Sequence, residues 1–115
     1  MAGTYRLKID QGATLNRPLR WLHDGEPKDL TGAEARMEIR TAAGGTLIHR
    51  LDTSNGGLVL GAEAGTILIR IPAAISSTWR TFQGVYDLEI VFPDETVVRL
   101  LQGPVVISAE VTTGE

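Results

Sequence analysis

The strongest constraint on the fold is a two-residue period, in which apolar and polar side chains alternate along most of the chain. Residues 32–41 show it most clearly, because small or apolar side chains there alternate with Glu34, Arg36, Glu38 and Arg40. Successive side chains of a β-strand point to opposite faces, so this pattern predicts a strand with one buried and one solvated face. No segment offers a helix long enough for a βαβ crossover, which favours an antiparallel fold.

The alternation predicts about nine short strands, and residues 72–79, which begin with Pro72, predict one short helical turn. Asp24-Gly25 and the run from Asn55 to Gly57 are strong turn signals. Strands at such regular spacing are typical of a β-sandwich or barrel. We expect one domain over residues 1–115, with 112–115 as a loose tail. The expected strands are residues 4–11, 14–23, 32–41, 46–53, 58–60, 66–71, 84–92, 96–101 and 105–111.

Tyr86 favours the immunoglobulin-like sandwich over the barrel. In immunoglobulin-like domains a tyrosine lies two residues before the inter-sheet cysteine, and its hydroxyl bonds backward to pin a corner. Tyr86 has this position if Leu88 replaces the cysteine, although a plain inward-facing aromatic explains Tyr86 equally well. Pro18 interrupts the second strand, which predicts an edge strand or a bulge there, because proline has no N–H to donate.

Composition and charge exclude several classes of function. At 115 residues the chain is the size of one domain, and its net charge of −3 lacks the basic excess of nucleic-acid binders. No cysteine is present, so disulfides, thiolate nucleophiles and Cys-ligated metals are excluded. Neither a signal peptide nor a membrane-spanning apolar run is visible. We expect no nucleic-acid or membrane partner.

The search for catalytic or metal-binding motifs is negative. His23 and His49 lie on different expected strands without further ligands, and both are interpreted as solvated side chains. No serine lies in a Gly-x-Ser-x-Gly motif, and the glycines near residues 56–65 lack the Gly-Lys-Ser/Thr ending of a phosphate loop. We therefore predict no catalytic residue, no metal and no cofactor, and a protein that is not an enzyme.

Two aromatic residues near the helical turn, Trp79 and Phe82, are candidate interface residues. Exposed aromatics mark interfaces, but large aromatics are more often buried, so capping of the core is the favoured alternative for both.

Four charged residues form a second candidate interface. Arg36 and Arg40 share one expected outward face, and Asp87 and Glu89 share another. We hypothesise that the two sets meet, either across neighbouring strands or across a subunit contact.

A series of short phrases lies in order along the chain: Ile9 to Thr14, Asp29 to Ala33, Ala35 to Arg40, Asn55 to Leu58, Gly84 to Glu89, Val98 to Gly103 and Glu110 to Thr112. Together they resemble small virion structural proteins of tailed bacteriophages and prophages, and the phrase Asp29 to Ala33 also resembles the N-terminal β-domain of phage baseplate upper proteins. The resemblance covers residues 5–112, with a departure at Asn16-Arg17-Pro18 that puts the pairing of the second strand in doubt.

The resemblance implies a non-enzymatic virion component made in the cytoplasm of the bacterial host. The expected role is an adaptor that joins tail fibres or baseplate components to the particle, with tail, fibre, portal or capsid subunits as partners. Multiple copies in a symmetric assembly would make weak contacts sufficient, and strand addition at a sheet edge is one docking mode. Capsid decoration is the first alternative. A carbohydrate-binding module for the host surface is the second, which exposed Trp79 and Phe82 flanking a groove would favour.

Overall fold

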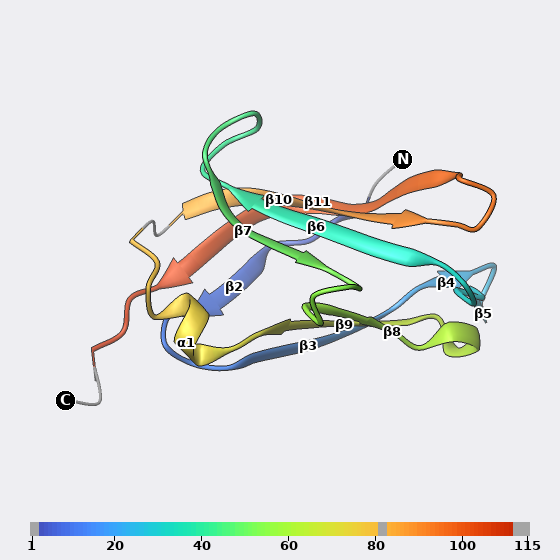
Figure 1. The fold of residues 1–115 in the computed structure, drawn as a ribbon, viewed down its shortest axis with the longest axis horizontal. Helices are drawn as coiled ribbons and strands as arrows, with labels where there is room; N and C mark the ends of the chain where they lie inside the picture. The colour runs from blue at the N-terminus through green and yellow to red at the C-terminus, as the bar shows by residue number, and fades with distance from the viewer. Residues whose placement is uncertain (1–2, 81–82, 112–115) are drawn as a thin grey trace.

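The computed structural model describes residues 3–80 and 83–111 and folds them into two packed β-sheets (Figure 1). The strands are β1 (Gly3–Thr4), β2 (Leu7–Asp10), β3 (Leu15–Arg20), β4 (Leu22–His23), β5 (Glu26–Pro27), β6 (Glu34–Arg40), β7 (Leu47–Asp52), β8 (Leu58–Leu60), β9 (Thr66–Ile71), β10 (Gln83–Val91) and β11 (Val97–Ser108). A 3-10 turn, η1 (Ala62–Ala64), precedes β9, and a four-residue helix, α1 (Ala73–Ser76), follows it.

The strand order identifies the type of sandwich. The large sheet has the order β1-β11-β10-β6-β7, with β2 also paired to β11, and the small sheet has the order β3-β9-β8. Figure 1 shows the large sheet above the small one, with α1 at one end of the sandwich. Strands in this order are those of an immunoglobulin variable-type domain, whose G, F, C and C′ strands face B, E and D. The predicted all-β, immunoglobulin-like sandwich is confirmed.

The core lies between the sheets and follows the alternation of the sequence. On β6 the burial alternates from residue to residue, and the buried Met37 lies opposite the buried Leu88 of β10. Burying a side chain of this size stabilises the fold by about 1.5–3 kcal/mol. The buried apolar residues are Leu7, Ile9, Leu30, Ala35, Met37, Ile39, Leu51, Leu58, Ile67, Ile69, Ile71, Trp79, Tyr86, Leu88, Ile90, Val105 and Ile107.

The last two predicted strands are one continuous strand, β11, which runs through Gly103 and Pro104. The predicted break was wrong for a reason that the pairing shows. Gln102 accepts a bond from the Tyr5 N–H, so its carbonyl faces the N-terminal strands, and Pro104, two residues on, faces the same side. Because Pro104 faces away from β10, its missing N–H costs no bond to that strand. On the side that Pro104 does face, the N-terminal strand is itself interrupted, between β1 and β2.

Two further local features departed from the sequence pattern. Asp24 and Gly25 both have positive φ (51° and 80°) and close an extra hairpin between β4 and β5, as Asp-Gly turns do. A register shift beside Arg40 pairs that residue with Leu47 and Ile39 with His49. This bulge explains why the apolar residues of 46–53 share no single face.

Tyr86 links three parts of the fold but forms no local corner. Its hydroxyl donates a 2.7 Å hydrogen bond to the carbonyl oxygen of Tyr5, which lies 81 residues upstream rather than a few. The Arg17 guanidinium in turn donates to the Tyr5 hydroxyl. The interrupted N-terminal strand is therefore held on one side by β10 and on the other by β3. Burial raises the pKa of Tyr86 to about 12, so the hydroxyl keeps its proton at physiological pH.

Several sheet edges among the described residues have features that hinder pairing with other strands. β3 is an edge strand, as Pro18 predicts, and Arg17 on it points inward. The edge strands β1 and β8 have only two and three residues. At the β7 edge, the Asn55 side chain donates to the Arg50 carbonyl and accepts from the Asp52 N–H, both at 3.0 Å. Asn55 thus occupies the groups that another strand would use.

Replacing Asn55 with alanine is expected to open the β7 edge. The Arg50 carbonyl and the Asp52 N–H lose their partner, which costs about 1 kcal/mol of folding free energy and frees both groups for a second copy. We expect concentration-dependent dimers in sedimentation-velocity runs. Ser54→Ala, in the same turn, serves as the control and stays at the wild-type oligomeric state. A monomeric Asn55→Ala protein at millimolar concentration would show that Asn55 does not protect the edge.

Candidate functional site

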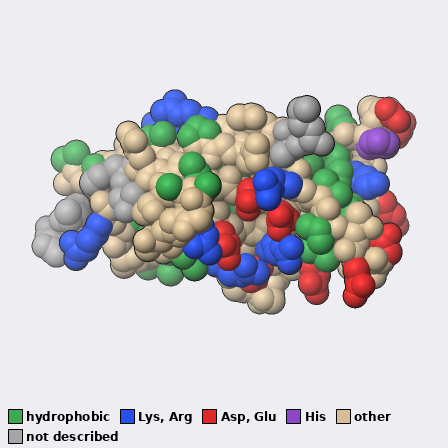
Figure 2. Space-filling view, turned by 90° about the horizontal axis from the view of Figure 1, so that it is seen from above, with side chains coloured by type: hydrophobic (Ala, Val, Ile, Leu, Met, Phe, Trp, Pro, Cys, Tyr) green, Lys and Arg blue, Asp and Glu red, His purple; other side chains and the backbone are tan. Residues whose placement is uncertain are grey.

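The outer face of the large sheet carries a ladder of opposite charges across four strands, here called the charged face. Figure 2 looks down on this side and shows Lys and Arg side chains mixed with Asp and Glu side chains. Side chains on this face are neighbours because the strands pair in register. It has as many acidic residues as arginines. The members are Arg36, Glu38 and Arg40 on β6, Arg50 and Asp52 on β7, Asp87 and Glu89 on β10, and Arg99 on β11.

Two groups of ion pairs make up the charged face. In the first, Glu89 lies between Arg36 at 2.8 Å and Arg99 at 3.8 Å, and Arg99 also contacts Asp87 at 3.6 Å. These contacts join β6, β10 and β11. Each pair is exposed to solvent, so each contributes at most about 1 kcal/mol to folding.

The second group is centred on Glu38. Its carboxylate accepts from Arg40 at 2.8 Å and from Arg50 at 2.9 Å, and Arg50 reaches Asp52 at 3.1 Å. The hydrogen bonds from Arg40 and Arg50 hold the pKa of Glu38 below its usual value, and Glu38 raises the pKa of Arg50. Bonds from Ser54 and from the Asn55 N–H lower the pKa of Asp52. Glu38, Arg50 and Asp52 are therefore held in their charged forms.

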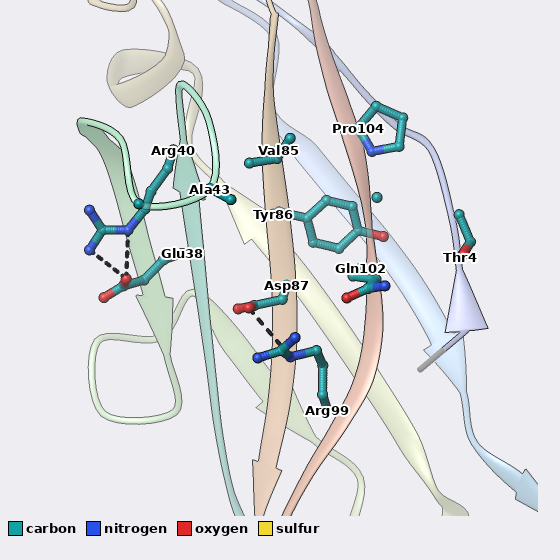
Figure 3. A pocket seen from close by; sticks show the side chains of 12 residues that line it. Thr4, Glu38, Arg40, Ala43, Val85, Tyr86, Asp87, Arg99, Gln102 and Pro104 are labelled. Carbon is teal, nitrogen blue, oxygen red and sulfur yellow. Dashed lines mark hydrogen bonds and ion pairs between the residues drawn. The ribbon is translucent and has the colours of Figure 1, made fainter. Parts of the chain in front are cut away.

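A groove of about 630 Å³ crosses the charged face (Figure 3). Ion-paired side chains line it beside small and apolar groups. Its members are Thr4, Glu38, Arg40, Ala43, Gly44, Val85, Tyr86, Asp87, Arg99, Gln102, Gly103 and Pro104. Ala43 and Gly44 belong to the β6–β7 loop, which rises above the sheet in Figure 1.

The chemistry of this groove suits binding rather than catalysis. Arginines and carboxylates that are already paired present fixed donors and acceptors, and Val85 and Pro104 add apolar contact area. Within the described residues, no three His, Asp or Glu side chains gather where a metal ion would be held. The helices of residues 3–80 and 83–111 include none with the length and apolarity to cross a membrane.

The structure brings together part of the predicted charged set. Arg36 meets Glu89 across β6 and β10, which is the cross-strand form of the hypothesis. Arg40 bonds to Glu38 of its own strand instead, and Asp87 pairs with Arg99. Their role in an interface stays a prediction.

Trp79, one of the two candidate aromatic residues, is buried. Trp79 is 7% exposed and packs in the core cluster, so it caps the core and does not stand free for a partner. Its carbonyl accepts a 2.8 Å bond from the Gln11 amide. Phe82 lies outside the described residues.

His49 differs from its prediction as a solvated side chain. It points into the sandwich from β7, is only partly exposed, and its ring lies 5.7 Å from the ring of Trp79. The β6–β7 bulge beside Arg40 hid this direction, because it shifts the phase of the strand. The exposed His23 agrees with its prediction.

Sequence reasoning missed Arg50, Asp52 and Arg99. Arg50 and Asp52 are two residues apart, which places them on the same face of a strand. The apolar residues of 46–53 share no single face, however, so the sequence did not show which face that was. Arg99 reaches the acids of β10 through a second bulge, where the register of β10 and β11 shifts between Leu88 and Glu89. Bulges are not visible in a period-two pattern.

Protonation of His49 is expected to destabilise the fold. Burial holds the pKa of His49 below its ordinary value, so the unfolded chain, with a pKa of about 6.5, binds the proton more readily. The contribution of neutral His49 to folding stability is complete above pH 6.5, and it is lost as the pH falls through the pKa of His49 in the folded protein. Urea unfolding between pH 7.5 and 5.5 should show this loss, and a flatter profile for His49→Gln. His23→Gln is the control, and equal slopes in all three proteins would contradict the prediction.

The comparisons with known proteins show no family for this chain. Neither a protein-family model nor a curated protein matches the chain. One similar solved structure, Drosophila OTK extracellular domains 3–5, is 18% identical with a TM-score of 0.35; the match covers 93% of this chain and 32% of that one. Another, from a study of multimeric cell-adhesive interactions of VGSC beta subunits, is 8% identical with a TM-score of 0.41, covering 95% and 93%.

These findings correct the expected family. The similar structures are not phage proteins, so the identification with tailed-phage virion proteins was wrong. The phrases that suggested it consist of turn residues and alternating strand residues, such as Asn55 to Leu58 and Gly84 to Glu89. Any sandwich with similar turns selects such residues for backbone reasons.

Proposed function

We propose that this chain is a non-enzymatic protein-binding module that contacts its partner through the charged face and its groove. The observation that carries the proposal is the groove itself, which combines paired arginines and acids with apolar floor residues on an exposed sheet face. Protein interfaces have this mixture, and arginine is enriched in them.

The protected edges support docking through a face. Pro18 and the inward Arg17 protect β3, and Asn55 occupies the β7 edge. A partner strand at the β3 edge would meet Pro18, which has no N–H, and one at the β7 edge would find the Arg50 carbonyl and the Asp52 N–H already bonded. The charged face has no such obstacle, and its central pairs are held across strands.

The identity of the partner stays a prediction. A virion adaptor and a capsid decoration protein would both use a protein-binding face, and no observation favours either. A carbohydrate-binding module needs exposed rings as stacking platforms, and the burial of Trp79 removes one of the two rings expected to provide them.

Site-specific photo-crosslinking tests the docking face. A photoreactive amino acid replaces Ala43 beside the groove, and in a second protein replaces Val59, which is 45% exposed on β8 of the small sheet. Both are expressed in the source organism, irradiated, and their crosslinked products identified by mass spectrometry. We expect one protein to crosslink to position 43 and not to position 59. Crosslinks at position 59 alone, or to glycans, would contradict the proposal.

The partner so identified is then used in a binding titration. Asp87→Lys reverses a charge beside Arg99 in the groove and is expected to raise the Kd at least about tenfold. Asp24→Lys makes the same change in the β4–β5 turn, away from the charged face, and should leave the Kd unchanged. Equal affinities of the two variants would place the interface elsewhere.

A further inference from the structure

A second hollow, of about 340 Å³, lies at the opening between the two sheets on the β7 side, and it is distinct from the groove. Three elements contribute to it: β7 with the turn that follows, the end of β9, and α1. Its lining residues are His49, Asn55, Gly56, Gly57, Arg70, Pro72 and Ile75. It shares none of these residues with the groove.

The charges that line this hollow have one sign. Among the described residues, Arg70 and His49 are the titratable side chains that line it, and none of the described carboxylates does. Every arginine of the charged face has an acidic partner, whereas Arg70 has none among residues 3–80 and 83–111. Arg70 is exposed and belongs to the outward-facing residues of β9, so it borders the hollow from its rim. No acid of the described chain takes up the hydrogen-bonding capacity of its guanidinium.

The surroundings make an ionic contact here stronger than one on an open surface. Pro72 and the 37%-exposed Ile75 form an apolar side of the hollow, and the Trp79 ring lies behind His49. Apolar walls reduce the screening of charge pairs by water. Asn55, on the opposite side, is held in place by its bonds to β7.

We propose that this hollow receives a glutamate or aspartate side chain of the bound protein partner, with the guanidinium of Arg70 donating to the carboxylate. Arginine pairs with carboxylates through two parallel N–H donors, which gives such a contact direction as well as strength. The protein source of the carboxylate rests on the proposed function. The chemical preference of the hollow for a carboxylate does not, and it is measured separately.

His49 makes the contact dependent on pH. Among the elements packed around His49, β9 brings one charged group, Arg70. The other neighbours are uncharged: Ile75 of α1, Asn55 of the β7–β8 turn and Ile39 of β6. A carboxylate bound beside His49 favours its protonated form, so binding raises the histidine pKa. By linkage, affinity for the carboxylate increases as the pH falls from 7.5 to 5.5, a range in which glutamate stays ionised.

The test is a titration of the full chain by ¹⁵N NMR with the peptide acetyl-Ala-Glu-Ala-amide as the probe. The glutamine peptide acetyl-Ala-Gln-Ala-amide is the neutral comparison, and acetate is the small free carboxylate. We expect shifts at Gly56, Gly57 and Arg70 with the glutamate peptide, a Kd at least about tenfold higher for Arg70→Gln, and an upward shift of the His49 pKa on binding. Arg20→Gln removes an arginine from β3 of the same sheet and should bind as wild type does.

Several outcomes would overturn the proposal. They are equal binding of the two peptides, unchanged affinity in Arg70→Gln, and the absence of shifts around the hollow at about 50 mM peptide. Acetate binding as tightly as the peptide would assign the hollow to free small carboxylates instead of a protein side chain. Failure here leaves the crosslinking at Ala43 unaffected, and failure of that crosslinking leaves the peptide titration intact, so the two proposals are separable.

Discussion

Truncation of Leu88 to alanine is expected to lower the free energy of unfolding by about 4 kcal/mol, because it removes buried methyl groups and leaves a cavity. Leu88 is fully buried on β10, opposite Met37 of β6 and Leu101 of β11, so neighbours on both sides restrict collapse of the site. Domains of this size have about 5–15 kcal/mol of stability, so the loss is a large fraction of the total.

The position of Leu88 adds to this expectation. It lies where immunoglobulin domains carry the inter-sheet cysteine, two residues after the tyrosine, and this chain has no cysteine. Packing must supply what a disulfide contributes elsewhere, about 2–4 kcal/mol. Urea unfolding followed by circular dichroism measures the change. Val97→Ala, at a 47%-exposed site on β11, is the control and should cost under about 1 kcal/mol. A similar loss in both variants would mean that the β10 core is not the main source of stability.

Replacing Gly103 with alanine is expected to cost about 3 kcal/mol and to loosen the N-terminal strands. A Cβ at Gly103 would clash with the carbonyl oxygen of Tyr5, and because that oxygen belongs to the backbone, the strand must move. The movement strains the packing and weakens the bond from the Tyr86 hydroxyl to the same oxygen. Hydrogen exchange should report the loss as faster exchange of the Leu7 and Ile9 amides, which belong to β2.

Gly44→Ala separates steric contact from the general effect of adding a methyl group. Gly44 has a φ of 73°, and a Cβ there would meet nothing within 4 Å. Only backbone strain of about 1 kcal/mol is expected, with no change in β2 exchange. If Gly103→Ala behaves like Gly44→Ala, the Tyr5 carbonyl can move away without loss.

The sandwich could be predicted because each long strand carries its own period. On β6 and β10 the alternating residues around Met37 and Leu88 go to the core as expected. What the period does not show is which strands pair, since that depends on contacts between distant residues. Tyr86 illustrates this, because its spacing from Leu88 suggested a local corner, while its actual partner is the carbonyl of Tyr5.

The candidate site was less predictable for the same physical reason. Arg36 and Glu89 could be paired because the alternation is regular along both of their strands, so the sequence shows that both side chains point outward. Arg99 and Arg50 join the charged face only through the register set by two bulges. The hollow around Arg70 combines β7 and its turn with β9 and α1, which come later in the chain, and no local sequence motif predicts such a combination.

The parallel pairing of β2 with β11 has a mechanical consequence. Leu7 to Asp10 pair in register with Val105 to Ser108, so the first and last long strands run in the same direction. The chain enters this ladder at one end and leaves it at the other (Figure 1). Tension applied through the two flanks therefore pulls along the strands and loads all their hydrogen bonds in shear at once. A hairpin pulled from its open end would instead unzip bond by bond. The parallel ladder is therefore expected to resist force along its strands better than a hairpin ladder of the same length.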